Sequence, residues 1–196
     1  MAGGSFHVVS LACAGLLATA AIPLGAKRKE GSSASYSAQS AGLAAWERIA
    51  TVLRHPRCLN CHQLESPLQG DVPRAHIPHV VRGPDDHGVS AMRCGNCHNQ
   101  MGNNPTSRTP GAPHWGLAPV SMLWEGMSVG DLCRMIRDPE RNGNRTPEAL
   151  IQHMEEDPLV AWGWDPGPGL DPVPIPHQEF VGFVRRWVEG GTPCPQ

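Results

Sequence analysis

The sequence predicts a mainly α-helical fold with long coil segments. Apolar residues recur with helical spacing in four separate stretches, whereas alternating apolar and polar runs are negligible. Glycine (22) and proline (20) together make up about a fifth of the 196 residues, and such content is typical of long irregular connections. Aromatic side chains are few, at six Trp, three Phe and one Tyr. We therefore expect a group other than side chains to fill part of the core.

The N-terminal segment is predicted to be a signal peptide. Residues 8–26 form a long uncharged apolar run, and Ala18-Thr19-Ala20 matches the A-x-A cleavage pattern of secretory signals. An uncleaved anchor is the alternative, because the run is long enough to span a bilayer and basic residues 27–29 follow it. Cleavage is expected after Ala20 or Ala26, which predicts an exported, periplasmic protein. The expected organisation is a signal peptide over 1–26, a Ser/Ala/Gly-rich linker over 27–40 and one domain over 41–196.

The four helical stretches have recognisable boundary residues. Pro56 ends the first, and Ser128 with Asp131 forms a capping box that begins the second. Thr146–Pro147 is an N-cap followed by a first-turn proline, and Gly190–Gly191 ends the last helix. The expected helices cover residues 42–55, 129–137, 147–156 and 176–190. The long coils between them are expected over 64–92, 99–122 and 157–175.

Four of the seven cysteines fall in two copies of one pattern. These are Cys58-Leu59-Asn60-Cys61-His62 and Cys94-Gly95-Asn96-Cys97-His98. C-x-x-C-H is the attachment signature of c-type haem, in which both thiols form thioethers and the histidine is the proximal iron ligand. At this composition roughly 0.01 copies are expected by chance. The motifs predict two haem c groups, held by Cys58, Cys61, Cys94 and Cys97, with His62 and His98 on the two irons.

Two other uses of the cysteines compete with this interpretation. The four thiols could hold one zinc ion as a pair of C-x-x-C knuckles. A redox disulfide is a weaker alternative, because it is typical of a single motif on a βαβ scaffold. The shared histidine offset and the export signal favour haem, since thiolate zinc sites are typical of reducing compartments.

With these motifs the chain resembles di-haem c-type cytochromes of the bacterial periplasm. More narrowly, it is similar to small cytochromes associated with isoquinoline 1-oxidoreductase-type molybdenum hydroxylases, over about residues 50–195. The stretches that carry the narrower resemblance are Gln69-Gly70-Asp71, Arg82-Gly83, Pro110-Gly111-Ala112-Pro113, Trp115 and Leu117. The resemblance implies a partner dehydrogenase. Only 36 residues separate His62 from His98, so we expect one compact cytochrome c-like domain that encloses both covalently attached haems.

An iron that only carries electrons needs a sixth, distal ligand. For the first haem the inter-motif loop offers His76, with His79 as the alternative. For the second haem we expect Met122, which precedes a helix in a Pro-rich coil, with His114 and Met127 as alternatives. Methionine ligation raises the potential, so electrons would pass from the first haem to the second.

The two cysteines left in the predicted domain are Cys133 and Cys194. An even remainder in an oxidising compartment predicts a disulfide between them.

The expected function is periplasmic electron transfer by single electrons, from a partner dehydrogenase to another cytochrome or an oxidase. The formal net charge of −2 excludes a strongly basic nucleic-acid binder, and no membrane contact beyond an N-terminal anchor is expected. The main enzyme alternative is a di-haem peroxidase with one open iron. Its family has longer chains with more widely spaced haem motifs. The zinc-binding protein is the second alternative.

Overall fold

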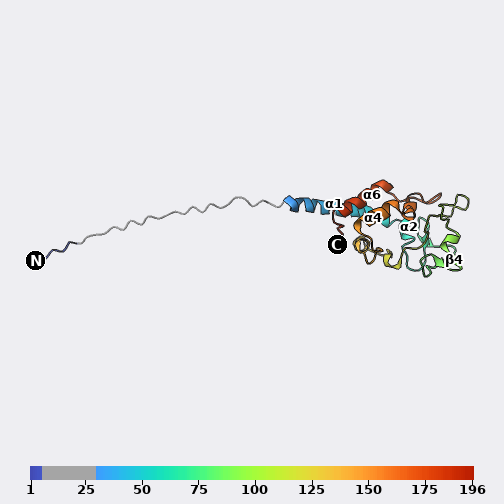
Figure 1. Ribbon diagram of the computed structural model, residues 1–196, viewed down its shortest axis with the longest axis horizontal. Coiled ribbons are helices and arrows are strands. Elements are labelled where there is room, and N and C mark those ends of the chain that lie inside the picture. Colours follow the sequence, from blue (N-terminus) through green and yellow to red (C-terminus); the bar gives the residue numbers. More distant parts are fainter. Residues whose placement is uncertain (6–29) are drawn as a thin grey trace.

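The computed structural model describes residues 1–5 and 30–196 (Figure 1). Most of the expected signal peptide, including both cleavage positions, lies outside the described residues. None of the helices in the described part of the chain is both long and apolar enough to cross a membrane.

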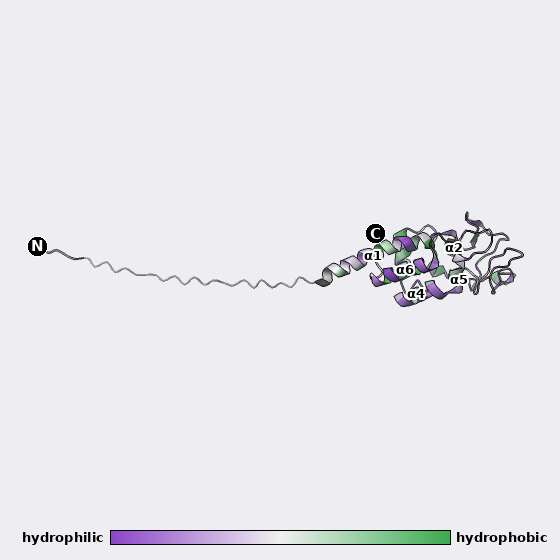
Figure 2. Cartoon of the chain, turned by 90° about the horizontal axis from the view of Figure 1, so that it is seen from above, coloured by the Kyte–Doolittle hydropathy of each residue, from purple (hydrophilic) through white to green (hydrophobic). Residues whose placement is uncertain are grey.

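Helices gather at one end of the body and coil segments at the other (Figures 1 and 2). The six α-helices of the described residues are α1 (Glu30–Leu53), α2 (Pro56–Leu59), α3 (Val129–Arg137), α4 (Pro147–Glu156), α5 (Pro158–Ala161) and α6 (His177–Glu189). The coil end contains two antiparallel hairpins of two-residue strands, β1 (Leu68–Gln69) with β2 (Arg74–Ala75) and β3 (Gly88–Val89) with β4 (Met92–Arg93). Short 3-10 turns are η1 (Cys94–Asn96), η2 (Val120–Met122) and η3 (Trp162–Trp164).

Helix boundaries set by local caps agree with the prediction. Ser128 accepts a hydrogen bond from the Asp131 backbone N–H at the start of α3. Thr146 does the same for Ala149 at the start of α4. Each cap satisfies a backbone donor that has no partner inside the helix, so the boundary is encoded within four residues.

Two expectations need correction. The expected coil over 157–175 contains the helix α5, and the expected linker is partly helical. Residues 30–40 are helical in the structure, because α1 begins at Glu30 rather than at residue 42. The side chains of residues 33–41 are exposed, so this part of α1 buries no core face. Helix extension costs little once a turn has formed, and the packed segment around Trp46 supplies that turn.

The core lies where α1 packs along α6. Trp46 and Trp187 are almost fully buried, and their ring centres are 5.0 Å apart. Trp46 donates its indole N–H to the Val129 carbonyl (3.1 Å) and Trp187 donates to the Pro193 carbonyl (2.9 Å). Gly42 lets α1 approach the C-terminal segment, because a Cβ there would lie 2.8 Å from the Pro193 ring.

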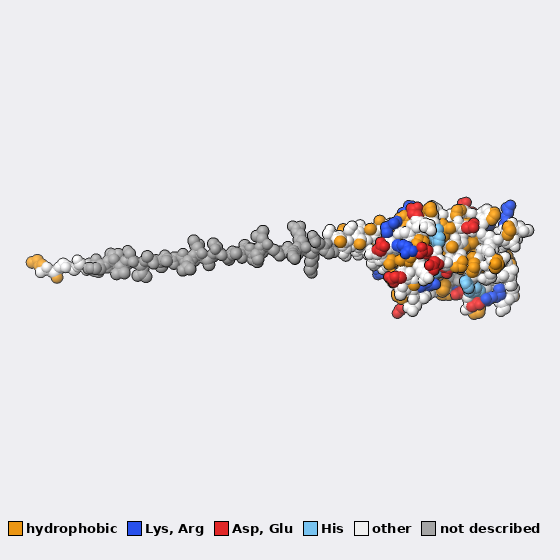
Figure 3. Space-filling model, turned by 45° about the horizontal axis from the view of Figure 1, so that its top comes forward, with side chains coloured by type: hydrophobic (Ala, Val, Ile, Leu, Met, Phe, Trp, Pro, Cys, Tyr) orange, Lys and Arg blue, Asp and Glu red, His pale blue; other side chains and the backbone are white. Residues whose placement is uncertain are grey.

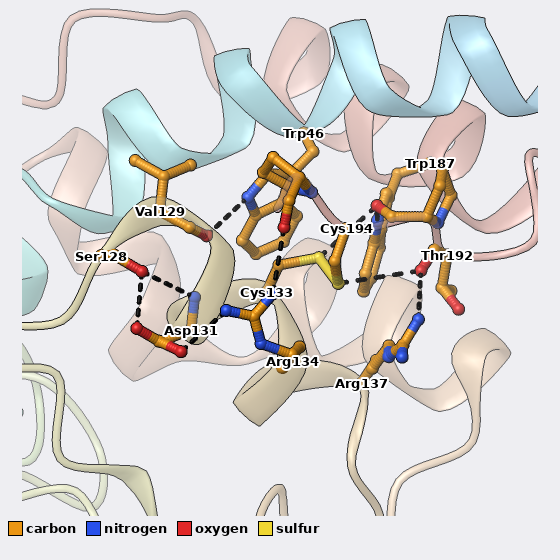
Figure 4. The surroundings of a disulfide bond; sticks show 12 residues. Trp46, Ser128, Val129, Asp131, Cys133, Arg134, Arg137, Trp187, Thr192 and Cys194 are labelled. Atoms are coloured by element: carbon orange, nitrogen blue, oxygen red, sulfur yellow. Dashed lines mark hydrogen bonds and ion pairs between the residues drawn. A yellow bond between two sulfur atoms is a disulfide. The ribbon is translucent and has the colours of Figure 1, made fainter.

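The predicted disulfide between Cys133 and Cys194 is confirmed (Figure 4). It joins buried α3 to the tail that follows α6, across a sequence separation of 61 residues. Arg134 and Arg137 of α3 reinforce the link by donating to the Pro195 carbonyl (3.0 Å) and the Thr192 carbonyl (3.3 Å). The C-terminal segment is therefore held against the helical end at three points.

Replacing both Cys133 and Cys194 by Ser should lower the free energy of unfolding by about 4 kcal/mol, since the bridge restricts a long loop in the unfolded chain. Urea unfolding of the oxidised protein and the double variant measures this difference. The reduced wild type is the control and should match the variant. Equal stabilities of the oxidised and reduced wild type would contradict the prediction.

Candidate functional site: two cysteine–histidine motifs

The first motif sits on α2 and the turn that follows it. His55 caps α2 by accepting the Arg57 backbone N–H, and Pro56 occupies the first turn. The Cys61 and His62 backbone N–H groups both donate to the Cys58 carbonyl (3.2 and 3.3 Å), which continues the helical turn through the motif. As a result Cys58, Cys61 and His62 all line one cavity.

This cavity is apolar. Its volume is about 250 Å³, just below the range typical of small-molecule and cofactor pockets. The rest of its wall comes from segments far along the chain, namely the coil 116–124 and α4. The aliphatic and thioether side chains that line it are Leu53, Leu117, Met122, Ile136, Leu150, Met154, Leu159 and Val160.

His62 is oriented from two sides. Its Nδ1–H donates to the Met122 carbonyl (2.7 Å), and its ring stacks on Trp124 with centres 3.3 Å apart. Burial lowers the pKa of His62 to about 4, so the imidazole is neutral at physiological pH. With Nδ1 occupied, Nε2 keeps a free lone pair, which is the form of histidine that ligates metals.

The thiols of this motif are held in their protonated form. Desolvation by the surrounding protein raises the pKa of Cys58 to about 12 and that of Cys61 to about 11. Zinc ligation and thiol–disulfide exchange both use the thiolate. Across residues 1–5 and 30–196, no three His, Cys, Asp or Glu side chains lie close enough together to hold a metal ion. Among the described residues the four thiols are therefore not gathered as a tetrahedral zinc site would require.

Two buried donors at the cavity have no protein acceptor. They are Arg57 Nε and Trp124 Nε1, and neither has a hydrogen-bond partner among the described residues. Buried polar groups are normally paired. A group with carboxylates that enters the cavity would supply the missing acceptors, and haem carries two propionates. The lining thus fits haem in its thiols, its imidazole, its apolar walls and its unpaired donors.

The second motif repeats the arrangement around its histidine. His98 follows η1 and is buried, and its Nδ1–H donates to the Pro110 carbonyl (2.7 Å). Its ring stacks on Trp115 with centres 4.5 Å apart. Gly111 allows this approach, because a Cβ there would lie 2.4 Å from two carbonyl oxygens. Each motif histidine therefore has its own backbone carbonyl on Nδ1 and its own tryptophan against one ring face.

The surroundings of the two motifs differ in exposure. Cys97 is exposed, whereas Cys58, Cys61 and Cys94 are all partly buried. The second motif lies at the coil end, whereas the first faces the helical end. A group bound at Cys94 and Cys97 would be more open to solvent than one bound at the first motif.

The two distal candidates lie beside the opposite motifs from those expected. The His76 ring centre is 6.0 Å from that of His98, and Met122 lines the first cavity. Hydrogen bonds explain the exchange. The hairpin β1–β2 is tied to Asn60, through its carbonyl and its side chain, and leads the chain away to the second motif. The coil before Met122 returns to the first motif, where the Ala118 N–H donates to the Cys61 carbonyl.

Arg82 holds the coil end together. Its guanidinium donates to the Leu64 carbonyl (2.7 Å), the Ala118 carbonyl (2.6 Å) and the Gln63 carbonyl, and it forms an ion pair with Asp86. Its side chain is 12% exposed. One side chain therefore joins the residues after the first motif, the loop before the second motif and the coil that walls the first cavity.

The two motifs also share an aromatic contact. Trp115, stacked on His98, meets the edge of Trp162 at 4.7 Å between ring centres, and Trp162 lines the first cavity. Asn103 fixes Trp162 by accepting its indole N–H (2.9 Å). The two sites thus lie in one domain, and the Trp115 and Trp162 rings lie between them.

Several of these residues have no signal of their own in the sequence. Trp124, Arg57, Trp162 and Asn103 act through contacts with segments far along the chain. Arg82, Pro110 and Trp115, by contrast, belong to the stretches that carry the family resemblance, although those stretches do not indicate which contacts the residues make.

Comparison of the chain with protein-family models, with curated proteins and with solved structures finds no match.

Replacing Arg82 by Ala should lower the free energy of unfolding by about 2–4 kcal/mol, because three carbonyls and Asp86 lose a charged donor. Urea unfolding measures the loss. Arg54→Ala is the matched control, since Arg54 is exposed at the end of α1, and it should change stability little. Arg82→Lys should recover only part of the loss, because one ammonium cannot reach four acceptors. Equal effects of Arg82→Ala and Arg54→Ala would contradict the role assigned to Arg82.

Proposed function

We propose that this protein is a periplasmic electron-transfer protein that carries single electrons through two covalently attached haem c groups. The observation that carries the proposal is the shared geometry of His62 and His98. Each follows a C-x-x-C turn and donates Nδ1–H to a backbone carbonyl at 2.7 Å, which leaves Nε2 for iron. The apolar cavity that borders Cys58, Cys61 and His62 supports it further.

The chain's own residues would attach and orient the group. Each thiol would add across a vinyl double bond of the porphyrin, so that a C–S bond would form and the thiol hydrogen would go to the other vinyl carbon, without net oxidation. Arg57 Nε and Trp124 Nε1 would donate to a propionate. When bound, haem supplies one-electron chemistry through its iron.

The lining of the first cavity favours a carrier over a peroxidase. Two side chains that can ligate iron, His153 and Met154 of α4, line the same cavity as His62. His153 Nδ1 lies 3.2 Å from Asp157, which leaves its Nε2 free. A sixth position filled by the protein is what a carrier needs, whereas a peroxidase keeps that position open for peroxide.

Surface features support docking of partner proteins at the coil end. The large apolar side chains exposed along the coil segments are Leu64, Val72, Ile77, Val81, Met101 and Val120. Acidic and basic side chains are interspersed on the visible face (Figure 3), which accords with a net charge of −2. Contact would therefore depend on apolar area more than on long-range steering. The family resemblance points to a dehydrogenase donor and to a cytochrome or oxidase acceptor.

The full chain, expressed with a haem-maturation system, should gain the mass of two haem groups that survive denaturation. Cys58→Ala/Cys61→Ala and Cys94→Ala/Cys97→Ala should each retain one, and Cys133→Ser/Cys194→Ser should retain both. Intact mass and the reduced visible spectrum measure this, with low-spin α and β bands expected. A colourless protein that binds zinc would overturn the proposal. High-spin ferric iron that binds cyanide in the wild type would favour the peroxidase alternative.

A further inference from the structure

The ring of His76 lies beside the ring of His98 at the second motif. Their centres are 6.0 Å apart and their planes are inclined at 57°. The stacked pairs His62–Trp124 and His98–Trp115 are much closer, at 3.3 and 4.5 Å, and nearly parallel. The two histidines are therefore neighbours without being stacked.

That separation matches the one that a metal ion between two imidazoles would require. A metal–imidazole nitrogen bond is about 2 Å long, and the nitrogen lies about 1 Å from the ring centre because ring bonds are short. Two imidazoles on opposite sides of one ion thus have centres about 6 Å apart.

In both rings Nδ1 is hydrogen-bonded and Nε2 is the nitrogen that could bind a ligand. His98 Nδ1 is bonded to the Pro110 carbonyl at 2.7 Å, and His76 Nδ1 is bonded to the Pro78 carbonyl at 2.8 Å. Only Nε2 remains on each ring for a ligand. A backbone carbonyl on Nδ1 fixes the tautomer and orientation of an imidazole that ligates a metal.

The position of His76 is set by the first motif. His76 directly follows β2, and β1–β2 is anchored where the Leu68 N–H donates to the Asn60 carbonyl (2.9 Å) and Asn60 Nδ2 donates to the Gly70 carbonyl (3.0 Å). The Ile77 N–H donates to the Gln69 side chain (3.2 Å). A residue inside the first C-x-x-C-H motif thus supports the loop that reaches the second.

We propose that His76 is the distal ligand of the second haem, so that this iron lies between His98 and His76. The inference rests on the proposed function. It assigns bis-histidine ligation to the more exposed of the two sites. Two imidazoles leave the second iron without the methionine that would raise its potential, in contrast to the pairing of His98 with Met122 that the sequence predicts.

The test uses the full chain with one haem at a time. In Cys58→Ala/Cys61→Ala, which keeps only the second haem, adding His76→Ala should convert the ferric spectrum from low-spin to high-spin and open the iron to added imidazole or cyanide. His79→Ala is the matched control, because His79 is an exposed histidine of the same loop, and it should leave the low-spin spectrum unchanged. His76→Met should restore a low-spin iron with a raised midpoint potential.

The converse variant separates this proposal from the pairing that the sequence predicts. In Cys94→Ala/Cys97→Ala, which keeps only the first haem, His76→Ala should leave the spectrum unchanged. A change of spin state here, or none in the other single-haem protein, would overturn the assignment of His76. Intact mass distinguishes failure of the proposed function, because a chain without covalent haem fails before any ligand is tested. Circular dichroism of each variant checks that it folds.

Discussion

The coil end of this protein depends on the guanidinium of Arg82. Segments rich in glycine and proline form few backbone hydrogen bonds with one another, so their carbonyls need donors from elsewhere. Arg82 reaches carbonyls at residues 63, 64 and 118 and pairs with Asp86. Its own backbone N–H donates to the Glu65 carbonyl and its carbonyl accepts from Gly88. Helices fix one end of the molecule through apolar burial, whereas one charged side chain fixes much of the other.

The same connections make the two cysteine–histidine motifs parts of one unit. The carbonyl that orients His62 comes from Met122, beyond the second motif, and the hairpin that carries His76 to His98 starts from Asn60 in the first. Neither site is built from a contiguous stretch of chain. A short spacing between the motifs is compatible with two haems, because the site at each motif is lined in part by a segment that follows the other motif.

Features encoded within a few residues were predictable from the sequence, and features set by long-range contacts were not. The caps at Ser128 and Thr146 determine α3 and α4. The six site residues that the motifs name stay a prediction. The Cys133–Cys194 bridge was predictable because these are the two cysteines of the predicted domain that lie outside the motifs. The hydrogen-bond partner of His62 lies 60 residues away, and nothing local to His76 indicates which motif it approaches. The helical start at Glu30 was missed because its composition is typical of a linker.

The placement of α4 at the wall of the first cavity has a consequence for the order of assembly. Cys58 and Cys61 are synthesised well before residues 147–156, whose Leu150, His153 and Met154 complete that wall. During this interval the thiols stand on an open chain, within reach of a maturation enzyme. Once α4 packs, its side chains cover part of the same cavity. On the proposed function, haem attachment at the first motif would therefore precede the packing of α4.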